Sequence, residues 1–166
     1  MKKIIVIGCP GGGKSTFSRA LADITAIPLY HLDMMYWNED RTTVPKDIFR
    51  SRLASAMEGE SWIIDGNYGS TMELRIKAAD TVFFLDYSAD TCLSGVMERK
   101  GKPRSDMPWV EPEDYSDEEF IKFIENYERE SKPKVMALLE RYSDKDIHIF
   151  RKRKDTDEYL RRLKNN

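Results

Sequence analysis

The chain has 166 residues, of which 27 are Lys or Arg and 29 are Asp or Glu, giving a formal net charge of −2 at pH 7. This length fits one domain, and a balance so close to neutral argues against a protein that coats nucleic acid by charge alone. No apolar run approaches the length of a membrane-spanning helix, and the first one is too short for a secretory signal. The two cysteines form no disulfide framework. We therefore expect a single-domain protein of the reducing cytoplasm.

The first half of the chain alternates between short apolar runs and segments of helical periodicity. Strands are predicted at residues 3–7, 27–32, 62–64 and 81–85, because each run is short, apolar and bounded by turn or polar residues. Helices are predicted at residues 14–23, from Pro45 to about Gly59, and at 72–79 and 90–100. The run at 81–85 is apolar on both faces, which is typical of a strand covered by helices on both sides.

The second half begins with a loop at residues 101–112. Ser116 and Glu119 have the spacing of a capping box, and the helix that follows meets Pro133, which is expected to kink or divide it. A fifth strand is predicted at 147–150 and a last helix from Asp155 to Leu163. Strands that alternate with helices predict a parallel five-stranded sheet with right-handed crossovers, in a three-layer α/β/α sandwich.

Residues 8–15 read Gly-Cys-Pro-Gly-Gly-Gly-Lys-Ser and fit the phosphate-loop pattern G-x-x-x-x-G-K-[ST], between a predicted strand and a predicted helix. Such glycines let backbone N–H groups converge on phosphate oxygens, and the helix N-terminus adds partial positive charge. The bland alternative is a glycine-rich turn with an exposed lysine. In the functional interpretation Lys14 reaches the β- and γ-phosphates and the Ser15 hydroxyl holds Mg²⁺. The predicted ATP-phosphate site comprises Gly8, Gly11, Gly12, Gly13, Lys14, Ser15 and Thr16.

Cys9 lies inside this loop. A helix N-terminus lowers the pKa of a thiol, so Cys9 can be a redox-sensitive residue. The alternative, which we favour, is that a small side chain simply fits at this position. Cys92 is expected in a helix core.

Three carboxylates directly follow predicted strands: Asp33, Asp65 and Asp86. Ligands of open parallel sheets bind beyond the carboxyl ends of the strands, so all three are candidates for the site. Asp65 or Asp86 can help to hold Mg²⁺, which needs oxygen ligands, and Asp33 can orient and deprotonate an acceptor hydroxyl. Each can instead be a helix cap or a turn residue. The sequence leaves the choice between Asp65 and Asp86 open.

With these residues identified, the chain resembles the adenylate kinase-like branch of small P-loop kinases, and most closely the group called DNA topology modulation proteins. The resemblance covers nearly the whole chain. It rests on the phosphate loop and on segments 31–37, 62–68, 79–86 and 104–107, which include His-Leu-Asp, Asp-Gly-Asn-Tyr and Arg-Ser-Asp-Met. It implies a P-loop NTPase fold of the nucleoside and nucleotide kinase type, with ATP and Mg²⁺ as cofactors.

The resemblance also implies roles for particular residues. Asp65 helps Ser15 to hold the Mg²⁺ shell, and Asp33 matches an acceptor-side aspartate of related metabolite kinases. A lid is implied at about residues 99–115, and Arg151 or Arg153 flanks the adenine. The segment after Asp65 departs from adenylate kinases, because it lacks the Pro-Arg that binds the monophosphate acceptor there. AMP as the acceptor is therefore in doubt.

Basic residues at the end of the helix predicted for 90–100 are candidates for the lid. Phosphoryl transfer needs positive charge around the transition state, which Arg99 and Arg104 can supply. The alternative is a solvated basic helix end that favours the helix dipole.

Four residues make up the predicted acceptor site: Asp33, Trp37, Tyr68 and Arg75. Trp37, with the preceding Tyr36, can form a wall for an acceptor ring or pack under a loop. Arg75 can bind the acceptor or pair with Asp80 at the surface. The two histidines, His31 and His148, lack metal-ligand spacing and are interpreted as structural.

The sequence therefore predicts a P-loop kinase that transfers the γ-phosphoryl group of Mg-ATP to a small molecule, with nucleotides and nucleosides as the candidate acceptors. Lys14, Asp33, Arg99 and Arg104 are the predicted catalytic residues. The alternative is a nucleotide-binding or ATP-hydrolysing regulator associated with DNA topology. Its support is the basic segment 151–166, with seven basic and three acidic residues, whereas the acidic segment 111–130 opposes it.

Overall fold

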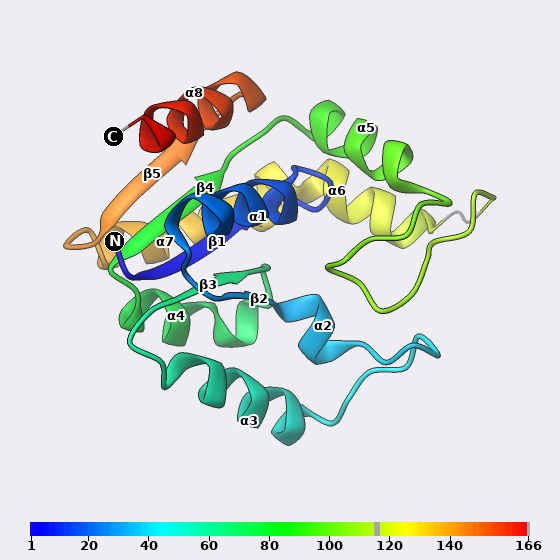
Figure 1. Ribbon diagram of the computed structural model, residues 1–166. Coiled ribbons are helices and arrows are strands. Elements are labelled where there is room, and N and C mark those ends of the chain that lie inside the picture. Colours follow the sequence, from blue (N-terminus) through cyan, green and yellow to red (C-terminus); the bar gives the residue numbers. More distant parts are fainter. Residues whose placement is uncertain (115–116, 166) are drawn as a thin grey trace.

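A five-stranded parallel sheet forms the centre of the molecule (Figure 1). The computed structural model describes residues 1–114 and 117–165, so the predicted cap at Ser116 lies outside the described residues. The strand order is β2-β3-β1-β4-β5, and every adjacent pair is parallel. The strands are β1 (Lys3–Gly8), β2 (Leu29–His31), β3 (Trp62–Asp65), β4 (Thr81–Leu85) and β5 (Asp146–Phe150).

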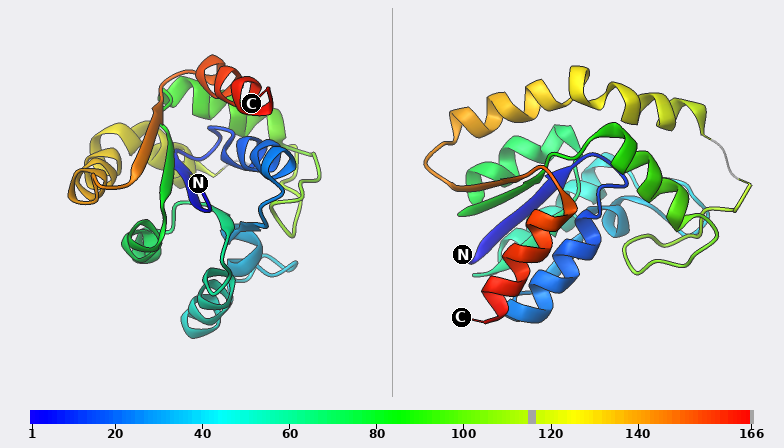
Figure 2. Two further views of the ribbon diagram at one scale, coloured as in Figure 1. Left: turned by 60° about the vertical axis from the view of Figure 1, so that its left-hand side comes forward. Right: turned by 90° about the horizontal axis from the view of Figure 1, so that it is seen from above.

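Helices cover both faces of this sheet. They are α1 (Lys14–Thr25), α2 (Leu32–Tyr36), α3 (Lys46–Met57), α4 (Gly69–Ala78), α5 (Ala89–Arg99), α6 (Glu118–Glu130), α7 (Lys132–Arg141) and α8 (Arg153–Lys164). In the left view of Figure 2, α1 and α8 lie on one side of the sheet and α4 and α7 on the other. The predicted three-layer α/β/α sandwich is confirmed.

The three central strands explain why the sheet needs two covering layers. All residues of β3 and β4, and those of β1 after Lys3, are buried. Because successive side chains of a strand point to opposite faces, such runs bury apolar side chains against helices on both sides. On one face, Phe17 of α1 packs against Phe83 and Phe150, with ring centroids 5.0 and 5.9 Å apart.

The structure corrects several predicted boundaries. The second strand is shorter than predicted, because the chain turns into α2 at Leu32. Helix α4 begins at Gly69, three residues before its predicted start, and α8 begins at Arg153. Pro133 divides the predicted long helix into α6 and α7, and it lies in the first turn of α7, where its missing N–H costs no helical hydrogen bond.

The loop between α5 and α6 is the segment predicted as a lid. Residues 100–114 form turns, bends and stretches without regular secondary structure, and the backbone N–H of Gly101 donates to the carbonyl of Glu111 at 2.7 Å. This bond closes the neck of the loop, which we call the lid loop (residues 100–111). Within the described part of the chain, no helix is long and apolar enough to cross a membrane.

Candidate active site

A cavity of about 850 Å³ lies where the phosphate loop, α2, the β3–α4 loop and the lid loop meet. It opens at the carboxyl ends of the central strands, where parallel sheets bind ligands. Of the predicted phosphate-binding residues, five line it: Gly11, Gly13, Lys14, Ser15 and Thr16. The other two, Gly8 and Gly12, belong to the same turn behind the lining, and the N–H of Gly12 donates to the carbonyl of Cys9 at 3.1 Å.

The phosphate loop needs glycine for two separate reasons. Gly8, Gly11 and Gly13 have φ angles of 147°, 80° and 84°, which residues with a Cβ rarely adopt. The loop also touches the backbone of α5: a Cβ on Gly95 would lie 2.0 Å from the carbonyl oxygen of Gly11. Gly95, which lies outside the motif, therefore permits the phosphate loop and helix α5 to pack directly together.

One side chain from the segment after β3 braces the phosphate loop, and a second holds that segment itself. The Asn67 side chain accepts from the N–H of Gly8 at 3.0 Å and donates to its carbonyl at 2.7 Å. Arg75 in turn donates to the carbonyls of Gly66 at 2.9 Å and of Asn67. The β3–α4 loop is thus fixed from both sides.

Arg75 does not line the cavity, although the sequence placed it in the acceptor site. Its side chain is completely buried, and burial lowers its pKa to about 10. The alternative pairing with Asp80 is also wrong, because Asp80 accepts from the backbone N–H groups of Lys2 and Lys3. Arg75 therefore acts as a hydrogen-bond donor to the carbonyl groups of the β3–α4 loop.

Lys14 is folded back onto its own loop. Its Nζ donates to the carbonyl oxygens of Gly8 at 2.9 Å and Cys9 at 3.2 Å. Burial lowers the pKa of Lys14, while the nearby carboxylates of Asp33 and Asp65 act to raise it. A lysine with two neutral partners and two nearby acids is suited to exchange those carbonyls for phosphate oxygens.

The structure separates the two carboxylates that were candidates for Mg²⁺. Asp65 ends β3 beside β1 and lines the cavity. Asp86 lies outside the lining residues and forms ion pairs with Lys132 at 2.9 Å and Arg151 at 3.5 Å. Asp65 is therefore the one of the two that faces the phosphate loop.

His31 does not line the cavity, but it contacts a carboxylate that does, in keeping with the structural role that its sequence context indicated. Its Nδ1 lies 2.9 Å from both carboxylate oxygens of Asp65. Burial favours the neutral ring, but the hydrogen bond and the charge of Asp65 outweigh burial and raise the pKa of His31 above its ordinary value. Strand register brings the two together, since His31 pairs with Asp65 across β2 and β3.

Asp106 in the lid loop is a site residue that the sequence reasoning missed. The Ser15 hydroxyl donates to its carboxylate at 3.0 Å, and Arg19 and Arg104 lie 3.6 and 3.4 Å from it. Burial acts to raise its pKa, but Arg104 and Ser15 hold it below the usual range. The only signal in the sequence was the Arg-Ser-Asp-Met segment.

The donors near Ser15 suit a hard cation. They are the Ser15 hydroxyl and the carboxylates of Asp65 and Asp106, all of which offer oxygen. Mg²⁺ prefers oxygen ligands and keeps several waters, so it needs few protein donors. Among the described residues, no group of three or more His, Cys, Asp or Glu side chains is arranged to hold a metal ion.

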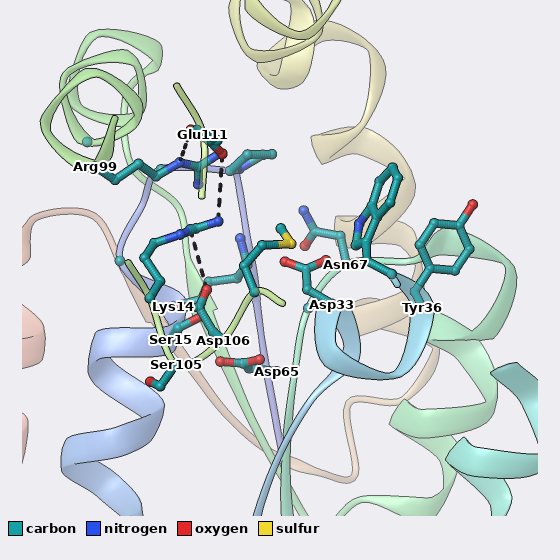
Figure 3. Close-up of a pocket in the computed structure, with 18 of the residues that line it drawn as sticks. Lys14, Ser15, Asp33, Tyr36, Asp65, Asn67, Arg99, Ser105, Asp106 and Glu111 are labelled. Carbon is teal, nitrogen blue, oxygen red and sulfur yellow. Dashed lines mark hydrogen bonds and ion pairs between the residues drawn. The ribbon is translucent and has the colours of Figure 1, made fainter. Parts of the chain in front are cut away.

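Both predicted lid arginines reach the cavity and are held by acidic residues of the lid loop (Figure 3). Arg99 contacts the Glu111 carboxylate through Nε at 3.2 Å and Nη2 at 2.8 Å. Arg104 lies between Asp106 and Glu111, at 3.4 and 3.7 Å. Glu111 thus contacts two arginines that are five residues apart in the chain, one at the end of α5 and one in the lid loop.

Asp33 and the predicted aromatic residues form the other end of the cavity, where Figure 3 shows Asp33 and Tyr36 projecting from α2. The Tyr68 hydroxyl donates to Asp33 at 2.5 Å. Burial raises the pKa of Asp33, and this hydrogen bond opposes the rise. Trp37 also lines the cavity, and its ring contacts the lid residue Trp109 with centroids 5.9 Å apart.

The predicted adenine-side arginines are not among the residues that line this cavity. Arg151 is exposed and faces Asp86. Arg153 lies over α5, where its Nη2 is 3.5 Å from the carbonyl of Thr91 and its Nη1 is 4.0 Å from Glu98.

No family model and no curated protein sequence matches the chain. Among solved structures, it is similar to shikimate kinase from Bacteroides thetaiotaomicron, with a TM-score of 0.57 and 19% identity over 98% of this chain and 96% of that one. It is also similar to shikimate kinase from Acinetobacter baumannii in complex with shikimate, with a TM-score of 0.65 and 15% identity over 98% of this chain and 90% of that one. A third similar structure is shikimate kinase from Aquifex aeolicus vf5, with a TM-score of 0.53 and 18% identity over 96% of this chain and 92% of that one.

At these identities the comparison establishes the fold. The predicted P-loop NTPase fold of the nucleoside and nucleotide kinase type is confirmed. The narrower resemblance to DNA topology modulation proteins finds no counterpart among the three structures and stays a prediction. The chain thus has the P-loop kinase-type fold, and its cavity joins a phosphate loop to an aromatic, carboxylate-bearing end.

Proposed function

We propose that the protein is a kinase that transfers the γ-phosphoryl group of ATP to a hydroxyl of a small molecule. One observation carries this proposal: the phosphate loop, Asp33 and two lid arginines line the same cavity. A protein that only binds or hydrolyses ATP has no need of a second, aromatic compartment with a half-buried carboxylate. The P-loop fold shared with three shikimate kinases supports the same conclusion.

In this reaction Lys14 and the loop N–H groups bind the phosphates, and Asp33 accepts the hydrogen bond of the acceptor hydroxyl. The acceptor oxygen bonds to the γ-phosphorus as the bond from that phosphorus to the β–γ bridging oxygen breaks. The hydroxyl proton passes to Asp33. Arg99 and Arg104 face the phosphate end, where they stabilise the charge on the transferring group.

Ser15 and Asp65 are the residues proposed to hold Mg²⁺, and Asp106 adds a third oxygen donor from the lid loop. A bound magnesium ion would neutralise charge that develops on the phosphate oxygens. Asp106 would then attach the lid loop to the same oxygen shell. Both cysteines are free thiols, as suits the reducing cytoplasm in which we place the reaction.

The acceptor candidates come from two sources. Shikimate is bound to one of the similar solved structures. Nucleosides and nucleotides follow from the resemblance of the sequence. Both types carry hydroxyl groups and fit a cavity of about 850 Å³ together with ATP.

A direct test measures acceptor-dependent formation of ADP from Mg-ATP with shikimate, nucleosides and nucleotides. We expect Lys14→Ala to abolish the activity. Asp33→Asn should lower the acceptor-dependent rate about a hundredfold while ATP affinity stays unchanged, because Asp33 acts on the hydroxyl. Asp47→Asn, an exposed carboxylate on α3, is the matched control. If no compound stimulates ADP formation above the Lys14→Ala level, the kinase proposal is wrong.

A further inference from the structure

Building on the proposed function, we propose that the acceptor is an uncharged alcohol carried on a planar aromatic ring system, and not a carboxylate or a phosphate ester. Nucleosides are one class of such compounds. The inference concerns the end of the cavity formed by α2, the β3–α4 loop and the tip of the lid loop. It rests on the rings that line this end and on the charges that accompany them.

Four aromatic side chains line the acceptor end: Tyr36, Trp37, Tyr68 and Trp109. They come from α2 and its end, the β3–α4 loop and the lid loop. Tyr36 meets Tyr68 edge to face with ring centroids 4.9 Å apart, and meets Trp37 at 5.3 Å. Rings packed in this way are held in fixed orientations and present flat or edge surfaces to a further ring.

A second layer fixes this arrangement from behind. The buried ring of Phe49 on α3 packs against Tyr36 at 5.5 Å and Tyr68 at 5.2 Å. The lid contributes from the opposite side, because Trp109 contacts Trp37 with centroids 5.9 Å apart. The acceptor end is therefore enclosed by rings from two sides when the lid loop occupies this position.

The charges of the cavity are distributed unevenly. Among the described residues that line it, five are basic: Lys14, Arg19, Arg41, Arg99 and Arg104. Lys14 belongs to the phosphate loop, and the ion pairs given above hold Arg19, Arg99 and Arg104 to lid carboxylates. Arg41 is the member that belongs to the acceptor end.

Arg41 is poorly suited to anchor a buried anion. Its residue is exposed, and its guanidinium carbon lies 5.2 Å from the centre of the Trp109 ring, where it forms a cation–π contact. Two further arginines lie near α2 but bind backbone. Arg52 donates to the carbonyl of Met35, and Arg75 donates to the β3–α4 loop.

Asp33 makes an anionic acceptor still less favourable. It is the carboxylate of this end, and the Tyr68 hydroxyl binds its Oδ1. A carboxylate or phosphate beside it would be buried near a like charge, which is costly without a fixed cation. An uncharged hydroxyl instead donates to Asp33, while the ring that carries it stacks on the aromatic wall.

The test compares acceptors that differ in charge and ring type at equal concentration. Adenosine, guanosine, cytidine and thymidine represent uncharged aromatic alcohols. Shikimate represents carboxylates, AMP represents phosphate esters, and myo-inositol represents uncharged non-aromatic alcohols. We expect at least one nucleoside to give a kcat/KM at least tenfold above those of shikimate, AMP and myo-inositol.

Variants test whether the aromatic side chains bind the ring of the acceptor. Trp37→Leu and Trp109→Leu should each raise the KM for the preferred nucleoside about tenfold while the Kd for ATP stays unchanged, since they remove ring stacking. Tyr142→Leu, an aromatic position outside the cavity, is the control. Arg41→Met should change the order of preference among the acceptors by less than threefold.

Two results would overturn this inference and leave the kinase proposal standing. One is a higher kcat/KM for shikimate, AMP or myo-inositol than for every nucleoside. The other is loss of transfer to shikimate in Arg41→Met from a wild type that phosphorylates it well, which would make Arg41 an anion anchor. If no acceptor on the panel stimulates ADP formation above the Lys14→Ala level, both this inference and the kinase proposal are contradicted.

Discussion

At the scale of single residues, several polar side chains near the site have backbone groups as their hydrogen-bond partners. Asn67 and Arg75 are the clearest cases, because their partners are the backbone groups of Gly8 and of the β3–α4 loop. A charged side chain that is fully buried persists only where its hydrogen bonds are made. The conformation of the phosphate loop and of the β3–α4 loop thus depends on side chains that bind their backbone.

Replacing Arg75 with Met should lower the free energy of unfolding by about 2–4 kcal/mol, because it leaves buried carbonyl oxygens without donors. Chemical denaturation measures the change. Arg161→Met on the exposed side of α8 is the control and should have an effect below about 0.5 kcal/mol. Equal stability of Arg75→Met and the wild type would mean that these carbonyls find other donors.

Cys9 should react slowly with thiol reagents in the folded protein. A hydrogen bond with Cys92 and burial raise the pKa of Cys9 well above its ordinary value, so the reactive thiolate is rare at neutral pH. In a Cys92→Ser variant, we expect labelling of Cys9 to be at least about a hundredfold slower than in denaturant. Rapid labelling of the native protein would support the redox-sensitive interpretation instead.

At the scale of secondary-structure elements, the contact between α5 and the phosphate loop has a testable consequence. Glycine inside a helix normally costs about 1 kcal/mol relative to alanine. At Gly95 the sign should reverse, because the added Cβ would lie 2.0 Å from the carbonyl oxygen of Gly11. We expect Gly95→Ala to lower the free energy of unfolding by about 1–3 kcal/mol and to weaken ATP binding.

Gly69→Ala provides the matched control for this prediction. Gly69 is also helical, in the first turn of α4, but a Cβ there meets nothing within 4 Å. This variant should leave both stability and ATP affinity unchanged or slightly improved. Denaturation and nucleotide titration of the two variants distinguish the contact from helix propensity, and a stabilised Gly95→Ala would disprove the contact.

At the scale of the whole molecule, the formal charge of −2 is the sum of separate acidic and basic regions. The acidic helix α6 follows the lid loop, and the basic helix α8 covers the opposite face of the sheet from α7 (Figure 2). Part of the positive charge of α8 is already paired, since Arg162 lies 3.5 Å from Glu158. We therefore expect little attraction for DNA.

Titration with duplex DNA at low salt tests this expectation, because phosphate contacts by basic residues depend steeply on salt. We expect no measurable affinity. A salt-dependent affinity that is lost when Arg161, Arg162 and Lys164 are neutralised would contradict the expectation and favour the alternative of a DNA-associated regulator.

The sequence by itself determined the parallel five-stranded sheet, the phosphate loop and the candidate carboxylate Asp33. Each of these depends on residues that are close in the chain: apolar runs of three to six residues, a contiguous glycine-rich motif, and a carboxylate that follows a predicted strand. Backbone conformation and hydrophobic periodicity are local properties, so they can be predicted without knowing what packs against them.

Only the tertiary structure decided how distant segments complete the site. Ser15 and Asp106 are 91 residues apart, and their contact depends on where the lid loop folds back. The same holds for the contact of His31 with Asp65 and for the ion pair of Asp86 with Lys132. It also holds for Arg75, which was predicted to bind the acceptor and instead donates to loop carbonyls. A polar side chain takes its partner from whichever donor or acceptor folding brings within about 3 Å, and spacing along the chain does not contain that information.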